Sequence, residues 1–191
     1  MLAQMISRVR RNHGLEHATI HVLSEKYANR FSAQGNSTAQ GFFLNIYGNI
    51  SDEEVEAAVH EAYRRMKAGE RQLAVHPNCG TVLLTTATMA TMASQLAFGL
   101  EMRRQKVREM TPAVLLHALP GAVLAAVTAL IVSRPVGMMV QEKYTTDGDL
   151  KELRITRIRR ITPSPVTRVF QFLLGQSGNQ HVQAYQVDTE G

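Results

Sequence analysis

Two histidines and a glutamate stand close together near the N-terminus, in the run His13-Gly14-Leu15-Glu16-His17. On a helix, His13 and His17 share one face, with Cβ atoms about 5–6 Å apart, so that both imidazoles can bind one metal ion. Glu16 follows His13 by three residues and lies near the same face. A carboxylate in that place can take a proton from a metal-bound water. These residues therefore predict a metal site with a general base.

A second run, His76-Pro77-Asn78-Cys79-Gly80-Thr81, offers two more ligands. Pro77 disfavours helix at His76, and Gly80 permits a tight turn. The side chains of His76 and Cys79 can therefore converge on one ion, as they do in zinc knuckles. Cys79 is the only cysteine, which excludes an intrachain disulfide. The alternative is a buried, inert cysteine beside a loop histidine.

Together the two runs supply four ligands for zinc or another divalent transition metal: His13, His17, His76 and Cys79. If all four bind, the site is closed, tetrahedral and structural. If three bind, a water takes the fourth place and Glu16 acts as its base. The order H-x-x-E-H is that of inverted zinc peptidases, in which a carboxylate is the third ligand. Four acidic residues could fill that role here: Glu53, Glu54, Glu56 and Glu142.

Two long segments, 82–100 and 113–132, contain no charged residue. Each is about long enough to cross roughly 30 Å of hydrocarbon as a helix, and the small residues in both would let the two helices approach closely in lipid. We therefore expect a helical hairpin in a membrane. Threonines in the first segment and His117 in the second weaken this interpretation, and two buried core helices of a soluble protein are the alternative.

A membrane hairpin returns the chain to the side from which it left, so residues 1–80 and 134–191 would face one compartment. The connector between the apolar segments is basic, but the flanks are basic too, and the positive-inside rule does not choose between them. We expect an integral protein of the bacterial cell membrane with its water-exposed parts in the cytoplasm. The first eleven residues lack the apolar run of a cleavable signal peptide.

The polar parts of the chain mix helix and strand patterns, which predicts an α+β fold. The N-terminal patterns give a helix at 13–27, a hairpin in 31–49 turning at 35–37, a helix from a Ser51–Glu54 capping box to Gly69, and a short strand at 72–75. Beyond the apolar hairpin, strands at 138–144 and 150–161 would flank an Asp147-Gly148 turn, and a last strand would cover 181–187. We thus expect three parts: an α+β metal-site unit at 1–80, the apolar helical hairpin at 81–133, and a β-hairpin with a basic segment at 134–191.

The C-terminal basic segment belongs to a chain of net charge +5. It contains Arg154, Arg157, Arg159 and Arg160, interleaved with isoleucines. The simplest interpretation is a solvated face, and anionic lipid headgroups are the second. Nucleic acid is not expected as a partner, because no aromatic stacking platform accompanies the charges.

The two metal-ligand runs and the hairpin after them resemble the YqhQ-like family of bacterial membrane proteins. That family pairs an H-G-x-E-H motif with a later H-P-x-C-G-T motif that leads into an apolar helix, and Pro135, Gln141 and Thr145-Thr146 match a third stretch in outline. The resemblance spans residues 10 to 146. It implies a metal-dependent enzyme of the membrane and supplies no substrate.

Three functions remain open at this point. The first is a membrane-anchored zinc-dependent hydrolase, with a peptidase as one option, in which Glu16 is the general base. The second is a non-catalytic membrane module in which the four ligands close a structural zinc site. The third is a metal-free interaction protein whose apolar segments form a core or an oligomer interface.

Overall fold

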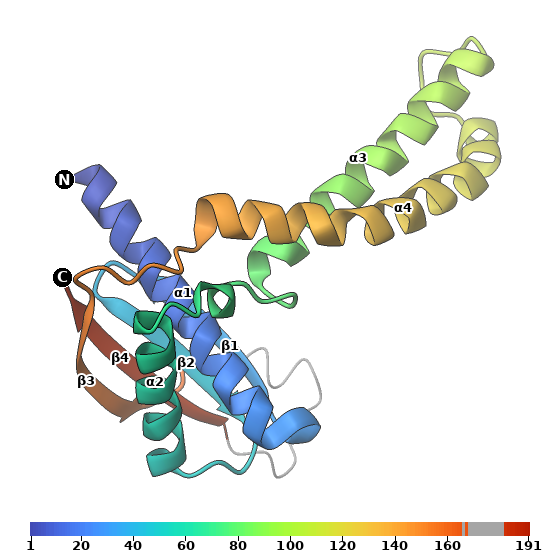
Figure 1. Cartoon of the computed structure of the whole chain (residues 1–191). Helices are drawn as coiled ribbons and strands as arrows, with labels where there is room; N and C mark the ends of the chain where they lie inside the picture. The colour runs from blue at the N-terminus through green and yellow to red at the C-terminus, as the bar shows by residue number, and fades with distance from the viewer. Residues whose placement is uncertain (166, 168–181) are drawn as a thin grey trace. The chain divides into compact units, whose positions relative to one another are not determined.

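The computed structural model describes residues 1–165, 167 and 182–191 (Figure 1). The chain divides into two compact units, one made of Met1–His76 with Glu142–Gly191 and the other of Pro77–Gln141. The second unit is inserted into the sequence of the first. The expected α+β class with an inserted apolar hairpin is therefore confirmed.

The first unit is a four-stranded antiparallel sheet with two helices packed on one face (Figure 1). The sheet order is β1-β2-β4-β3. The strands are β1 (Ser32–Thr38), β2 (Gly41–Tyr47), β3 (Arg154–Ile161) and β4 (Val182–Glu190), and the helices are α1 (Leu2–Tyr27) and α2 (Asp52–Lys67). Short 3-10 helices cover Ala28–Arg30 and Arg71–Ala74.

The core of this unit follows the expected apolar patterns. Phe42, Leu44 and Ile46 alternate along β2, and all three are fully buried against the helices. Fully burying a side chain of this size contributes about 1.5–3 kcal/mol. The capping box at the start of α2 is present, since the Glu54 N–H donates to Ser51 Oγ and the Ser51 N–H donates to Glu54 Oε2.

Two N-terminal expectations need correction. The hairpin exists, but β1 runs straight through residues 35–37, and the chain turns at 39–40 between Thr38 and Gly41. Residues 72–75 do not form a strand, because residues 72–74 lie in the 3-10 helix Arg71–Ala74 and Val75 follows its end. The Ala74 and Val75 carbonyl oxygens accept hydrogen bonds from α1 side chains instead of strand neighbours.

Two C-terminal expectations also need correction. Residues 138–144 are not a strand: Met138–Val140 end a long helix, and Gln141–Thr145 form a π-helical turn. No hairpin therefore forms around Asp147-Gly148. The Asp147 carboxylate instead accepts a hydrogen bond from the Asp149 N–H, which stabilises a local turn. The strand β3 pairs with β4 instead. Of the expected last strand, 182–187 lie in β4 and His181 lies outside the described residues.

The second unit is a pair of long helices that lie side by side, α3 (Gly80–Arg104) and α4 (Pro112–Val140) (Figure 1). Both begin with a side-chain cap, because Cys79 Sγ accepts from the Thr81 N–H and Thr111 Oγ1 accepts from the Val114 N–H. The helices are also linked by a 2.8 Å hydrogen bond between Thr86 and Ser133. Small residues of α4 make up most of its buried positions: Ala118, Ala122, Ala129, Ser133 and Gly137.

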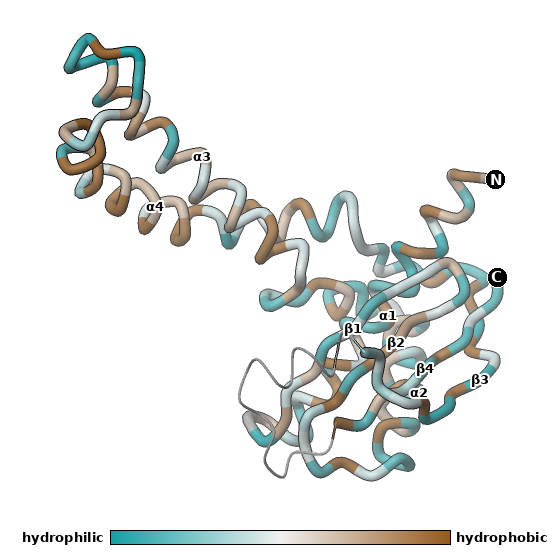
Figure 2. Tube along the Cα trace, turned by 180° about the vertical axis from the view of Figure 1, so that it is seen from behind, coloured by the Kyte–Doolittle hydropathy of each residue, from teal (hydrophilic) through white to brown (hydrophobic). Residues whose placement is uncertain are grey.

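Both of these helices are long and apolar enough to cross a membrane. In the most apolar 18-residue stretch of each helix, only 6% of the residues of α3 and 22% of those of α4 are buried. Figure 2 shows apolar residues along the length of both helices. Their exposed side chains include Leu83, Leu84, Leu96, Leu116, Leu124 and Ile131. A core helix of a soluble protein buries such residues, whereas in this unit they are exposed.

Candidate metal centre

The two histidines of the N-terminal motif lie on one face of α1, as their spacing predicts. The ring centroids of His13 and His17 are 4.4 Å apart, edge to face. The glycine between them lets the helix approach the loop at Asp147 closely, because a Cβ at Gly14 would lie 2.5 Å from the carbonyl oxygen of Asp147. The motif thus combines two imidazoles with a closely packed helix surface.

Backbone carbonyl groups fix the orientation of both imidazoles. His13 Nδ1 lies 2.9 Å from the Thr145 carbonyl oxygen, and His17 Nδ1 lies 2.8 Å from that of Ala74. A carbonyl oxygen can only accept, so Nδ1 carries the proton in each ring and Nε2 carries the lone pair. Histidines that bind metals are commonly oriented by such a second hydrogen bond.

Two further histidines extend this cluster within the first unit. The ring of His76 lies 5.0 Å from that of His21 and 6.0 Å from that of His17, measured between centroids. His21 Nε2 donates to the Val75 carbonyl oxygen at 2.9 Å. Burial, together with the neighbouring His21 and His17, lowers the pKa of His76 to about 4. His76 is therefore a neutral imidazole at neutral pH, which is the form that binds metals.

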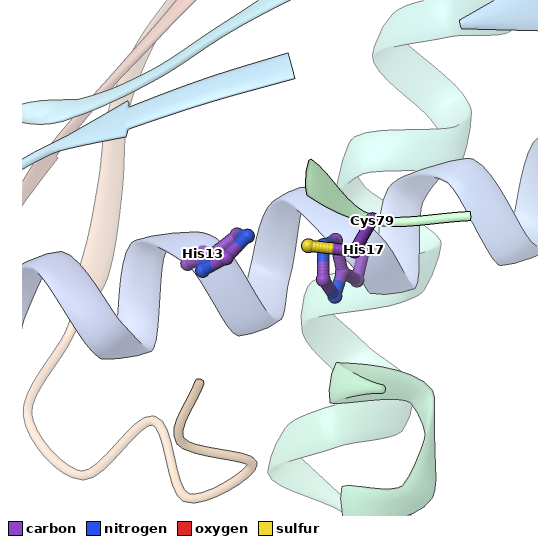
Figure 3. A group of neighbouring side chains, drawn as sticks. All are labelled: His13, His17 and Cys79. Carbon is purple, nitrogen blue, oxygen red and sulfur yellow. The ribbon is translucent and has the colours of Figure 1, made fainter. Parts of the chain in front are cut away.

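Cys79 completes a group that could bind a metal ion. The ligand atoms of His13, His17 and Cys79 all lie within 4.8 Å of one another (Figure 3). Cys79 follows His76 by three residues, so chain connectivity alone keeps the two Cα atoms within about 11 Å. Among the described residues, His76 is not part of this group of three. Two imidazole nitrogens and one sulfur form a donor set suited to soft or borderline divalent metals.

Glu16 is directed towards β1. Its side chain is 4% exposed, and its Oε2 accepts a 2.6 Å hydrogen bond from Ser37 Oγ. Burial raises the pKa of Glu16, while the Ser37 hydrogen bond and the nearby His13 lower it. The carboxylate also packs directly on β1 at Gly35, where a Cβ would overlap it. Glu16 is thus a buried carboxyl group next to His13.

None of the four other acidic residues considered as ligands joins the group in the described part of the chain. Glu54 caps α2 and forms an ion pair with Lys26 at 2.9 Å. Glu56 faces His60 at 3.9 Å. The site residues that the sequence did not indicate are Ser37 and the carbonyl groups that orient the imidazoles. Only the three-dimensional fold brings them to α1, and no local pattern marks them.

Residues 8–158 match the family described as a domain of unknown function, DUF6391. The chain belongs to this family. An uncharacterised protein of Picosynechococcus sp. (strain ATCC 27264 / PCC 7002 / PR-6) is 34% identical over 151 residues, a match that covers 72% of this chain and 65% of that relative. The chain thus spans slightly less than two thirds of the relative's length. No solved structure matches.

Both metal-ligand runs and the apolar hairpin lie inside the DUF6391 match, whereas β4 lies beyond it. The family has no assigned function, so membership leaves the chemistry of the site to the residues themselves. The likeness to the YqhQ-like family stays a prediction.

Proposed function

We propose that the chain is a membrane-anchored metalloprotein in which His13, His17 and Cys79 hold a zinc ion. The observation that carries this proposal is the grouping of their ligand atoms within 4.8 Å. The carbonyl groups of Thr145 and Ala74 support it, because they direct both Nε2 lone pairs away from the backbone. Two histidines and one thiolate are ligand types that zinc accepts.

The same site would serve hydrolysis, with peptides as one substrate class. Zinc held by three protein ligands acts as a Lewis acid and lowers the pKa of a water in its fourth position to about 7. Glu16 would accept the proton of the attacking water, since burial raises its pKa and a carboxylate with a higher pKa is a stronger base. Ser37 would hold that carboxylate in place through its 2.6 Å hydrogen bond.

A structural zinc site is the second candidate. Its support is His76, whose ring lies 6.0 Å from that of His17 and whose imidazole is neutral at neutral pH. A small movement of His76 would close a four-ligand site and leave no position for water. In that case the metal would tie α1 to the loop before α3, and Glu16 would have no catalytic role.

The spectrum of the cobalt-substituted protein separates the two candidates without a known substrate. An open site predicts a sulfur-to-cobalt band that Cys79→Ser removes and His76→Ala leaves unchanged, together with a visible spectrum that shifts as a bound water titrates. Loss of the four-coordinate spectrum in His76→Ala, with no titration in the wild type, would establish the structural site. No cobalt binding at all would contradict both.

The membrane part of the proposal rests on the exposed apolar hairpin and on the sheet whose strands precede and follow it in the sequence. The strand β2 precedes the hairpin and β4 follows it, yet they pair in one sheet. If α3 and α4 cross a bilayer, both flanks therefore lie in one compartment, which we propose is the cytoplasm. Labelling of cysteines introduced at Asn36 and Glu53 in intact cells, with a reagent that does not cross membranes, tests this side.

Anionic lipid headgroups are a further proposed partner, at the arginines of β3. Arg159 and Arg160 already pair with Asp188 and Asp52. The exposed Arg154 and Arg157 are therefore the better candidates for headgroup contact. The alternative is that these arginines only protect the edge strand from pairing with other chains. Replacing Arg154 and Arg157 with glutamine should weaken vesicle binding if they contact headgroups, and should leave it unchanged if they only protect the edge.

A further inference from the structure

The first two turns of α1 carry an apolar strip that the protein leaves exposed. Leu2, Met5 and Ile6 are 69%, 51% and 52% exposed. Their spacing of three and four residues places them on one side of the helix. Gln4 lies about 200° around the helix from both Leu2 and Ile6. This end of α1 is thus amphipathic, whereas the helix from Asn12 to Thr19 is mostly buried.

Three arginines follow the apolar strip and make the same end of α1 cationic. Their guanidinium groups donate to backbone carbonyls: Arg8 to Thr189, Arg10 to Lys143 and Thr146, and Arg11 to Ser7 and Leu150. Within the described ranges, none of the three forms an ion pair with a carboxylate. A carbonyl oxygen holds a guanidinium without cancelling its charge. Arg11 is buried, at 7% exposure, so the positive charges available to an anionic surface are those of the half-buried Arg8 and Arg10.

Arg10 ties this end of α1 to the segment that directly follows α4. Its Nη2 lies 2.9 Å from the carbonyl oxygens of both Lys143 and Thr146, and its own carbonyl accepts the Asp147 N–H at 3.0 Å. Lys143 is only three residues past the end of α4 at Val140. Ile6 precedes Arg10 by one helical turn, about 6 Å. If α4 crosses a membrane, connectivity holds the apolar strip within reach of that membrane's surface.

We propose that Leu2, Met5 and Ile6 insert into the interfacial layer of an anionic phospholipid membrane, with headgroup phosphates around Arg8 and Arg10. An apolar strip beside basic residues is the pattern of helices that lie in the interface. The proposal rests on the membrane anchoring proposed above. About 10 Å of α1 separates Ile6 from His13, so the contact would keep His13 close to the membrane surface.

The absence of tryptophan from the sequence gives a clean test. Single tryptophans are introduced into the full chain in vesicles of phosphatidylcholine and phosphatidylglycerol, and their fluorescence is quenched with lipid brominated near the headgroup end of the acyl chains. For Leu124→Trp, near the middle of α4, the lipid is brominated near the terminal methyl of the acyl chains instead. Ile6→Trp reports the strip, and Gln4→Trp is its matched control on the opposite face of the same turn. Leu124→Trp reports the hairpin, and the exposed α2 position His60→Trp reports water-exposed protein.

The proposal predicts quenching several-fold stronger at Ile6→Trp than at Gln4→Trp or His60→Trp, and a loss of that difference when phosphatidylcholine is the only lipid. Strong quenching at Leu124→Trp with Ile6→Trp no different from Gln4→Trp would overturn the interfacial contact and leave membrane anchoring intact. An unquenched Leu124→Trp would overturn the anchoring itself, and the interfacial contact with it. Circular dichroism of each variant confirms that the helices form.

Discussion

Replacing Gly35 with alanine should destabilise the first unit through Glu16. The new Cβ would overlap the Glu16 carboxylate, which would then have to leave Ser37 Oγ, now 2.6 Å away. Losing a hydrogen bond to a buried charged group costs about 1.5–3 kcal/mol. Alanine also has less conformational freedom than glycine in the unfolded chain, which stabilises the folded state by about 0.4–1 kcal/mol. We therefore expect the free energy of unfolding to fall by about 1–2 kcal/mol.

Urea unfolding measured by tyrosine fluorescence reports this change in the first unit alone. All five tyrosines lie in that unit, and the chain has no tryptophan. With a denaturant slope of about 2 kcal/mol per M, the midpoint should fall by about 0.5–1 M. Ser37→Ala is the matched control, because it removes the same hydrogen bond and adds no atom near Glu16.

A double-mutant cycle decides whether Glu16 carries the effect. Once Glu16→Ala has removed the carboxylate, the alanine at position 35 meets no clash, and the second substitution should be neutral or slightly stabilising. The coupling between the two positions should then be at least about 1 kcal/mol. An equal loss of stability in both backgrounds would refute the packing of Glu16 against β1.

Three shorter predictions concern other parts of the fold. Gly14→Ala should lower the urea midpoint of the first unit, because the new Cβ would lie 2.5 Å from the Asp147 carbonyl oxygen; an unchanged midpoint would contradict this close approach. The Tyr185 hydroxyl donates a hydrogen bond to Asp52 and lowers the pKa of its carboxyl group. The ionised Asp52 therefore stabilises the fold at any pH above its unfolded pKa of about 3.9. This contribution is lost as the pH falls through the lower pKa of the folded state. Tyr185→Phe should therefore flatten the stability change below about pH 4, measured as the urea midpoint against pH, and an unaltered acid limb would argue against the contact. Ser133→Ala should weaken the α3–α4 pair by about 0.6 kcal/mol in detergent unfolding, and a loss of several kcal/mol would mean that the hydrogen bond does more than link two helices.

Local patterns predicted the elements that carry the candidate site. The four-residue spacing of His13 and His17 placed both rings on one face of α1, and the capping box at Ser51 placed the start of α2. The uncharged segments predicted two long helices that could span a membrane. Each of these inferences depends on residues within a few turns of one another, where helix geometry alone fixes the relation.

The errors share a physical cause in long-range contacts. The run Gly35-Asn36-Ser37 has the composition of a turn, but it lies in β1 because its glycine and serine pack against Glu16. The Asp147-Gly148 pair suggested a hairpin, but the residues before it extend α4, and α1 holds the loop through Arg10. The carbonyl groups that orient His13 and His17 come from segments more than fifty residues away. No local pattern could have indicated them.

Metal content is the most direct test of the central claim. The full chain is purified in detergent, and its zinc is measured by plasma mass spectrometry beside His17→Ala and the matched control His60→Ala, whose histidine lies exposed on α2. We predict close to one zinc per chain in the wild type and in His60→Ala, and a loss of that zinc in His17→Ala with the helix content unchanged. A folded wild-type protein that holds no zinc, even after zinc is added back, would contradict the proposed metal centre.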